Sequence, residues 1–461
     1  MITKTPLEAE FCPPRDVPRE LSSISLSGIL SALSFALDLT EGRVMGHAVR
    51  SCLIGMKLAA ELGVSREGQD SLYYALLLKD AGCSSNAGRM SEMTGGDDRA
   101  IKRDMKLEDW TQVSWSVLGV LWKNVLPGAG PFSRAVRITE MSIHRQRNNE
   151  EMIQLRCGRG AQIALKIGLG EPAARAIHHL EEHWDGSGYP DSLRGAEIPI
   201  ASRIMAVAQH LDFFALERGE HTAMRVLQGH SGSWFDPELV KIAASLGRSG
   251  ELWSGKNPDE CRRRVLELAP ESAGATSAIQ IDRVCEAFAE IVDAKSAFTS
   301  SHSAGVAQAA LKIAEQLGMK NERCRMIWRA ALLHDVGKLS ISNAILDTPS
   351  KLNAKQWAAV HQHPVHTQQI LERIEPFAEL AAVASRHHER LDGKGYPYGL
   401  SGEHLPLEAR ILAVADVYGA LSEDRPYRPA FTGCEAIGIM RKMVPEKLDG
   451  DCFEALRSAV I

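Results

Sequence analysis

Four features in the second half of the chain have residue types and spacing suited to metal chemistry. The adjacent pair His387-His388 precedes a turn, Gly395-Tyr396-Pro397, and a separate pair, His334-Asp335, lies upstream and is followed by Lys338. Imidazole nitrogens and carboxylate oxygens are preferred ligands of manganese, iron and related divalent ions. A ligand set without thiolates disfavours a structural zinc site. The pattern predicts a metal-dependent phosphohydrolase.

Five histidines and two carboxylates in this half form the predicted ligand set. They are His302, His334, Asp335, His363, His387, His388 and Asp416. Seven ligands are too many for one tetrahedral ion and suit two bridged ions. Two ions about 3.5–4 Å apart can share a hydroxide, direct it at phosphorus and stabilise the leaving oxygen. A lone histidine is usually a surface or core residue, and His361 and His366 are assigned to that ordinary class.

The segments that must position these ligands have helical periodicity. Apolar residues recur at helical spacing after His302, and Gly318 ends that run. Asn353 is a predicted helix N-cap, and Pro364 is predicted to lie in a first helical turn. No segment alternates convincingly between apolar and polar residues, so we expect an all-α fold.

The first half of the chain repeats the second. His47 matches His302 and Asp80 matches Asp335, both at an offset of 255 residues. Further along, the turn at 185–190 matches that at 392–397, and the offset has become 207 residues. One insertion of 48 residues in the first copy accounts for both values. The chain is therefore predicted to be an internal duplication.

This duplication predicts the organisation of the chain. We expect a flexible N-terminus (1–20), a first copy (21–248), a linker (249–276) and a second copy (277–461). The insertion, at about 90–145, contains Trp110, Trp115 and Trp122 among apolar residues. It is predicted to form an amphipathic helical hairpin, and core packing is favoured over a binding face.

The first copy lacks most of the predicted ligands. Lys79 replaces His334, Arg156 replaces His363, Leu180 and Glu181 replace the double histidine, and Gln209 replaces Asp416. We hypothesise a metal-free regulatory copy in which Lys79 and Arg156 neutralise Asp80 and Glu181. A rival interpretation rebuilds a site from His178, His179 and His183. It is disfavoured because these histidines miss the double-histidine position and Gln209 supplies no carboxylate.

Bulk properties exclude several classes of protein. A net charge of −5 and a pI near 6.4 give no support for binding to a nucleic acid polymer. No apolar run approaches the roughly 18–20 residues of a membrane span. Nine cysteines are scattered without a Cys-x-x-Cys pair, which is typical of reduced thiols, so we expect a cytoplasmic protein.

From about Asp293 to Phe453 the second copy resembles the HD-GYP branch of the HD phosphohydrolases. The resemblance implies two tandem HD-type domains, the first degenerate. It implies that Asp335 bridges two ions, one held by His302, His334 and Asp416 and the other by His363, His387 and His388. Iron or manganese is the expected metal. Gly419 departs from the family, which often has aspartate at that position.

The resemblance also implies residues that act on the substrate. Asp335 and Lys338 would be catalytic, with Lys338 beside the scissile phosphate, where its charge stabilises the transition state. Arg425 and Arg428 would contact the ligand, because guanidinium groups suit phosphate oxygens and guanine edges. The loop of Gly395, Tyr396 and Pro397 would lie beside the site and also contact diguanylate cyclase (GGDEF) proteins.

The leading expectation for function is a cyclic di-GMP phosphodiesterase that forms linear pGpG, with further cleavage to GMP left open. One alternative is 3′,3′-cyclic GMP-AMP as the substrate. The other is a non-enzymatic cyclic-dinucleotide receptor or scaffold, which the intact ligand set disfavours. The sequence leaves the oligomeric state open, with a homodimer as one candidate because it is the commonest symmetric assembly.

Overall fold

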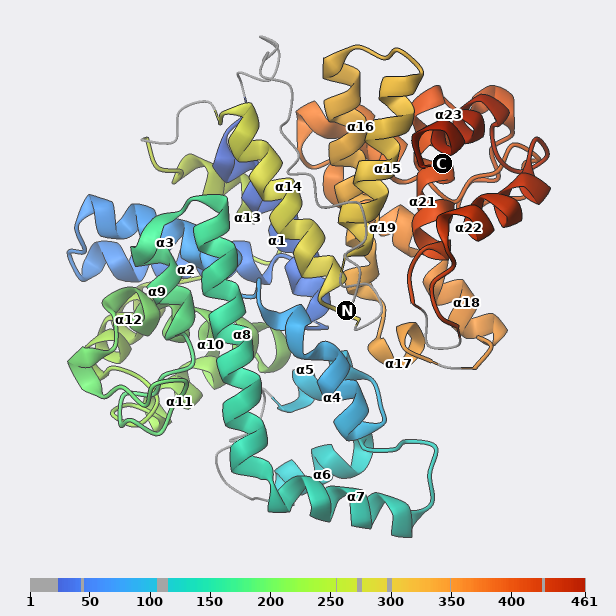
Figure 1. Ribbon diagram of the computed structural model, residues 1–461. Coiled ribbons are helices and arrows are strands. Elements are labelled where there is room, and N and C mark those ends of the chain that lie inside the picture. The colour runs from blue at the N-terminus through green and yellow to red at the C-terminus, as the bar shows by residue number, and fades with distance from the viewer. Residues whose placement is uncertain are drawn as a thin grey trace, which may run out of the picture.

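The computed structural model describes residues 24–42, 45–105, 115–253, 255–271, 276–296, 301–348, 350–424 and 428–460. Every regular element within these ranges is a helix, and the β-bridges there are isolated pairs. The predicted all-α fold is therefore confirmed (Figure 1). The N-terminal segment 1–20, predicted to be flexible, lies outside the described residues. No helix in the described ranges is long and apolar enough to span a membrane.

The first copy is built from eight α-helices outside its insertion. They are α1 (Leu26–Thr40), α2 (His47–Glu61), α3 (Arg66–Leu78), α8 (Arg145–Ile167), α9 (Gly170–His178), α10 (Ile200–Arg218), α11 (Glu220–Gly229) and α12 (Pro237–Ser249), with the short helices η2 (Cys83–Asn86) and η3 (Gly195–Glu197). Ser25 caps α1 by accepting a hydrogen bond from the Gly28 amide at 3.0 Å. Gly168 ends α8 in the left-handed conformation, with φ 90°.

The insertion is helical, as predicted. It contains α4 (Ala87–Thr94), α5 (Asp98–Met105), α6 (Trp115–Asn124) and α7 (Pro131–Ile143), and Figure 1 shows α6 and α7 at the far end of α8. The prediction that its tryptophans pack in a core is wrong for Trp115 and Trp122, which are 90% and 44% exposed. Helix α6 packs against α5 and α7, and Val117 is the buried apolar residue on it. Trp110 lies outside the described residues.

The second copy repeats this arrangement. Its helices are α14 (Ala278–Asp293), α15 (His302–Gln316), α16 (Asn321–Leu333), α17 (Asn343–Leu346), α18 (Ala354–Val360), α19 (His363–Leu371), α20 (Ala378–Ala384), α21 (Leu407–Leu421), α22 (Gly433–Met440) and α23 (Gly450–Val460), with η4 (Val336–Ser340), η5 (Glu375–Phe377), η6 (Gly402–His404) and η7 (Arg441–Met443). Asn353 caps α18 within a capping box, and Pro364 lies in the first turn of α19, both as predicted.

The predicted linker contains a helix, α13 (Pro258–Glu267), that packs against α1 and α2. Arg262 fixes it by donating hydrogen bonds to the Ser31 hydroxyl and the Gly28 carbonyl, both at 3.1 Å. The connection between the copies is thus part of the packed structure of the first copy.

The two copies contact each other reciprocally. Helix α1 of the first copy packs against η4 and α19 of the second, and α14, its counterpart, packs against η2 and α8 of the first. Individual contacts follow the same rule. Lys166 on α8 contacts Glu290 on α14 at 2.6 Å. Arg373 of the second copy matches Lys166, and it lies 4.4 Å from the ring of Phe35 on α1, which matches Glu290. Each copy therefore completes its core against the other.

Candidate metal centre

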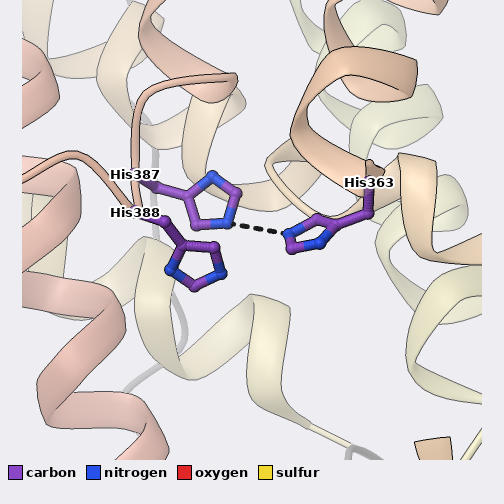
Figure 2. Close-up of side chains that lie close together, drawn as sticks. All are labelled: His363, His387 and His388. Carbon is purple, nitrogen blue, oxygen red and sulfur yellow. Dashed lines mark hydrogen bonds between the residues drawn. The ribbon is translucent and has the colours of Figure 1, made fainter. Parts of the chain in front are cut away.

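The seven predicted metal ligands converge at one place in the second copy. The side chains come from the start of α15, the end of α16, the start of α19, the segment after α20, and α21. Six of them form two groups, His302 with His334 and Asp335, and His363 with His387 and His388, and one ligand atom of each member lies within 4.8 Å of the others in its group. Figure 2 shows His387 and His388 pointing from one segment towards His363.

Asp335 belongs to the first group and also contacts the second. Its Oδ1 atom is 3.3 Å from His363 Nε2, and its Oδ2 atom is 3.2 Å from His334 Nε2. Asp416 also spans both, with Oδ1 3.3 Å from His302 Nε2 and Oδ2 3.5 Å from His388 Nδ1. Each carboxylate can therefore serve two neighbouring cations.

Hydrogen bonds fix the tautomers of three buried histidines. The Nδ1 atoms of His334, His363 and His387 lie 2.6, 2.7 and 2.7 Å from the carbonyl oxygens of the residues three positions earlier in the chain, Ala331, Val360 and Ala384. A carbonyl only accepts, so each Nδ1 carries the proton and each Nε2 presents a lone pair to the site. Metal-ligating histidines are commonly oriented in this way.

The contact between His363 and His387 supports a cation at this place. Their Nε2 atoms are 3.2 Å apart (Figure 2), although the Nδ1 hydrogen bonds leave a lone pair on each. Two lone pairs at this distance repel unless a proton or a metal ion lies between them. The donor set of imidazoles and carboxylates fits a divalent ion.

The charge states of these groups suit metal binding. Burial lowers the pKa of His388 to about 3 and also lowers the pKa values of His363 and His387, so these imidazole rings are neutral at pH 7, as a metal ligand must be. Burial alone would raise the pKa of Asp335, but His334 and Lys338 hold it well below its usual range. His302 behaves differently. Burial alone would lower the pKa of His302, but the carboxylates of Asp416 and Glu423 raise it to about 9.

Glu423 is a site residue that the sequence analysis missed. Its Oε2 atom lies 3.0 Å from Nδ1 of His302, so the carboxylate orients Nε2 of this ring towards Asp416. In the first copy, Asp212 lies 2.7 Å from Nδ1 of His47 and occupies the position that matches Gly419. The two copies thus orient corresponding histidines with different carboxylates, and no sequence motif marks Glu423 for this role.

A cavity of about 600 Å³, called the catalytic cavity below, opens over the cluster. Among the residues predicted to bind substrate, Lys338, Tyr396 and Arg428 line it. The Lys338 ammonium lies 2.5 Å from Asp335 Oδ2. The Arg428 guanidinium donates to the carbonyls of Ala420, Leu421 and Glu423 at the end of α21. Arg425 lies outside the described residues.

Gly395 and Pro397, the other two predicted loop residues, help to shape the turn. A Cβ atom on Gly395 would stand 2.5 Å from the Arg390 amide nitrogen, so this glycine permits close packing of the turn. Pro397 follows Tyr396 through a cis peptide bond. The turn is held by Glu389, a buried residue that accepts hydrogen bonds from the amides of residues 398–400 at 2.7–3.1 Å.

The first copy keeps the turn and replaces the ligands by ion pairs. Glu182, the counterpart of Glu389, accepts from the amides of Asp191 and Leu193 at 2.7 and 3.1 Å. Lys79 pairs with Asp80, and Arg156 pairs with Glu181, as hypothesised from the sequence. His178 and His179 instead lie near Asp191, at 3.2 and 3.0 Å. His183 turns to Ser187 at 2.9 Å and does not join them.

The family model described as "HD domain" matches residues 124–239 and 286–452, which lie in the first and second copies. The chain is 40% identical to 3′3′-cGAMP-specific phosphodiesterase 3 of Vibrio cholerae over 442 residues, 95% of each chain. It is 42% identical over 158 residues to a cyclic di-GMP phosphodiesterase response regulator of Xanthomonas campestris, covering 34% of this chain and 40% of that protein.

A solved structure has the same fold over almost the whole chain. The crystal structure of a cyclic GMP-AMP specific phosphodiesterase of V. cholerae matches with a TM-score of 0.64 and 36% identity, covering 94% of this chain and 97% of that one. The tandem arrangement is therefore shared with that structure and does not belong to this sequence alone.

Proposed function

The chain belongs to the HD domain family, in its HD-GYP branch with a degenerate first copy, and on this basis we propose that the second copy hydrolyses 3′,3′-cyclic GMP-AMP. One observation carries the choice of substrate. The relative named for this dinucleotide matches 95% of the chain, both copies included, whereas the Xanthomonas relative named for cyclic di-GMP matches 34%. The sequence analysis favoured cyclic di-GMP as the substrate, and this comparison instead supports the alternative substrate, 3′,3′-cyclic GMP-AMP.

The residues of the second copy have the chemistry that this reaction requires. We assign the seven clustered side chains as ligands of two divalent ions, with Asp335 between them. Such ions, when bound, activate water and stabilise charge on phosphate oxygens. Lys338 places its ammonium next to Asp335 at the cavity wall, where it can neutralise a non-bridging phosphate oxygen as negative charge accumulates.

The walls of the catalytic cavity suit a flat base attached to a phosphate. The Tyr396 ring stacks on His361 with centroids 3.9 Å apart, and lies 4.7 Å from the His388 ring. Tyr396 is thereby fixed as an aromatic surface beside the cluster, on which a nucleobase can stack. Trp357 is a further aromatic residue of the wall. The cluster then lies within reach of the phosphodiester that the base carries.

The test is a direct comparison of substrates. Metal-loaded protein is incubated with 3′,3′-cyclic GMP-AMP and with cyclic di-GMP, and linear products are resolved by chromatography. We expect kcat/KM at least about tenfold higher for the mixed dinucleotide, a difference of about 1.4 kcal/mol in transition-state binding. A preference for cyclic di-GMP would overturn the choice of substrate. Failure to cleave either dinucleotide with manganese or ferrous iron would overturn the enzymatic function.

A further inference from the structure

Helix α5, part of the insertion in the first copy, borders both halves of the chain. The first copy has a cavity of about 160 Å³ that is lined by the residues replacing three candidate ligands, Arg156, Glu181 and Gln209. The later part of α5 contributes Lys102 and Met105 to this lining. The first turn of α5 instead contacts the second copy, close to the catalytic cavity.

The contact is made by Asp98, the first residue of α5. This side chain is fully buried, and its Oδ1 atom accepts hydrogen bonds from the Asn343 amide at 2.8 Å and the Ser342 hydroxyl at 3.2 Å. Its Oδ2 atom lies 3.8 Å from the Lys295 ammonium. The first copy thus places one buried carboxylate against the start of α17 and the segment that follows α14.

The groups that Asp98 contacts are also bonded to one another. The side-chain amide of Asn343 donates to the Lys295 carbonyl and, at 2.7 Å, to Asp347 Oδ2. The other carboxylate oxygen of Asp347 accepts a hydrogen bond from the Ser296 hydroxyl. These bonds hold α17 and the segment after α14 together as one unit, and Asp98 is the contact that the first copy adds to it.

This unit forms one wall of the catalytic cavity. Five residues of the cavity lining belong to it, and we call them the α17 wall: Lys295, Ser296, Ile345, Leu346 and Thr348. None of the five is a candidate metal ligand, because those side chains come from α15, α16, α19, the segment after α20, and α21. A change in the α17 wall can therefore alter substrate binding and leave the ligand cluster in place.

The ligand cluster has an anchor of its own at the start of α15. Asp293 accepts hydrogen bonds from the amide and the hydroxyl of Ser303, at 3.0 and 2.7 Å, directly after the ligand His302. The first copy has the matching contact, in which Asp38 accepts from the Ala48 amide at 3.1 Å. This anchor is common to both copies and does not include α5.

The network around Asp98, by contrast, is found on one side only. Thr40 and Gly88 stand at the first-copy positions that match Lys295 and Asn343, at the offset of 255 residues. Neither can supply the ammonium or the amide group, and Asp98 lies in the insertion, which the second copy lacks. The network therefore accompanies the copy that keeps the ligands, although the other copy supplies one of its members.

We propose that Asp98 is a positioning residue for the substrate of the second copy, acting through Asn343 and Lys295 on the α17 wall. The substrate site of the second copy is incomplete without the insertion of the first. This inference rests on the proposed function, since it concerns the cavity that binds the dinucleotide.

The role of Asp98 follows from what its loss would do. Among the residues that the structure describes, Asp98 is the carboxylate within ion-pair distance of the Lys295 ammonium, so its removal leaves a buried cation without a counter-charge. The segment after α14 and α17 then separate more easily, and a smaller fraction of molecules has the α17 wall in the arrangement that fits the dinucleotide. The apparent affinity falls with that fraction. A loss of this kind raises KM and leaves kcat unchanged.

Asp98→Ala in the full, metal-loaded chain is the first test. We expect KM for the dinucleotide to rise about tenfold or more and kcat to change by less than about twofold, as for loss of a hydrogen-bonded charge that serves binding alone. Metal content, measured by mass spectrometry, should equal that of the natural protein. Asp97→Asn changes the exposed neighbouring carboxylate, and as the matched control it should leave KM unchanged.

Two further variants keep the test decisive if Asp98→Ala does not fold. Asp98→Asn retains an oxygen that can accept from Asn343 and Ser342 and loses the charge beside Lys295, so KM should rise, but less than in the alanine variant. Asn343→Ala breaks the link between α17 and the Lys295 carbonyl and should also raise KM. Because both changes act through the α17 wall, KM in the double variant should rise by less than the product of the two single effects.

An unchanged KM in a folded Asp98→Ala variant would overturn the proposal, as would an unchanged KM in both Asp98→Asn and Asn343→Ala. Loss of metal with a fall in kcat at constant KM would also overturn it, because Asp98 would then support the ligand cluster. Fully multiplicative effects in the double variant would exclude a shared route through the wall.

The outcome for Asp98 is separate from the choice of substrate. KM is measured with whichever dinucleotide the protein cleaves, and Kd is measured by calorimetry if a dinucleotide binds without being cleaved. Binding without cleavage would refute only the proposed function, and Asp98→Ala should still raise Kd. A protein that neither binds nor cleaves 3′,3′-cyclic GMP-AMP or cyclic di-GMP would refute both.

Discussion

Gly337 packs directly against His363: a Cβ atom on this glycine would stand 2.0 Å from the His363 carbonyl oxygen. The first copy contains the same contact, because a Cβ on Gly82 would stand 1.9 Å from the carbonyl oxygen of Arg156. The close approach of η4 to α19, and of its counterpart to α8, therefore sets where the side chain at position 363 or 156 enters its cavity. The geometry of the candidate metal centre therefore depends on this contact as well as on the clustered side chains.

Gly337→Ala should displace α19 and with it His363. We expect a loss of about 2 kcal/mol or more in the free energy of unfolding, because overpacking against backbone cannot be relieved by a rotamer change. Turnover should fall by more than the loss of folded protein accounts for, because the His363 side chain is misplaced. Gly82→Ala is the matched control, with a similar loss of stability and unchanged metal content. Denaturant unfolding and metal analysis measure both effects.

Metal should bind to the second copy alone. The purified full chain is expected to contain about two equivalents of metal by mass spectrometry. Asp335→Ala should lose metal and reduce turnover by more than about 100-fold, beyond the effect of changing an outer partner of a ligand. The double variant Asp335→Ala, His363→Ala should retain none. Metal that persisted after His302→Ala and His334→Ala were added to this double variant would indicate that the first copy binds an ion, against the ion pairs Lys79–Asp80 and Arg156–Glu181.

Glu423→Gln tests the residue that orients His302. The amide can still contact Nδ1 of His302, but it lacks the charge that holds the imidazole ring in place. We expect metal affinity, measured by competition with a chelator, to fall about 10- to 100-fold. Asp424→Asn changes a neighbouring carboxylate whose Oδ1 accepts the Ala430 amide at 2.8 Å, and it should leave metal affinity unchanged. Equal affinities for the natural protein and Glu423→Gln would remove Glu423 from the site.

Lys295 predicts a pH dependence of stability. Burial lowers its pKa from 10.5 to about 8, although Asp98, 3.8 Å away, acts in the opposite direction. Between these values the unfolded chain binds more protons at this lysine than the folded chain does. Its contribution to stability therefore increases as pH rises from about 8 to about 10.5. The free energy of unfolding is measured for the natural protein and for Lys295→Met at pH 8 and pH 10. The value for the natural protein minus that for the variant should be larger at pH 10 than at pH 8. A constant difference would contradict this.

The sequence predicted the cluster of candidate metal-binding side chains and the duplication. It did not predict the residues that orient those side chains. His302, His363 and Asp416 are recognisable because their types and order form a pattern. Glu423 lies 121 positions from His302, and a single carboxylate at that separation has no pattern to mark it. The exposure of Trp115 was also not predictable, since periodicity identifies an apolar helix face and cannot say whether another layer covers it.

The position of α5 could not be predicted for a similar reason. Asp98 and Arg99 read as an ordinary charged pair at a helix start, and only the assembled chain shows them against Ser342 and Ser340. By contrast, the ion pairs of the first copy followed from the repeat alone. Aligned positions share a location, so a lysine or arginine that replaces a ligand must meet the carboxylates that remain.

The reciprocal packing of α1 and α14 has a consequence for the origin of the chain. When position i of one copy contacts position j of the other, and position j of the first contacts position i of the second, the contact is that of a twofold-symmetric pair of identical subunits. Lys166 with Glu290, and Arg373 with Phe35, preserve that relationship within one polypeptide. The arrangement is what fusion of two genes for an ancestral symmetric dimer would leave. In a fused pair the two halves stay together without a binding equilibrium, so an intact ligand set in one half is sufficient for the whole chain.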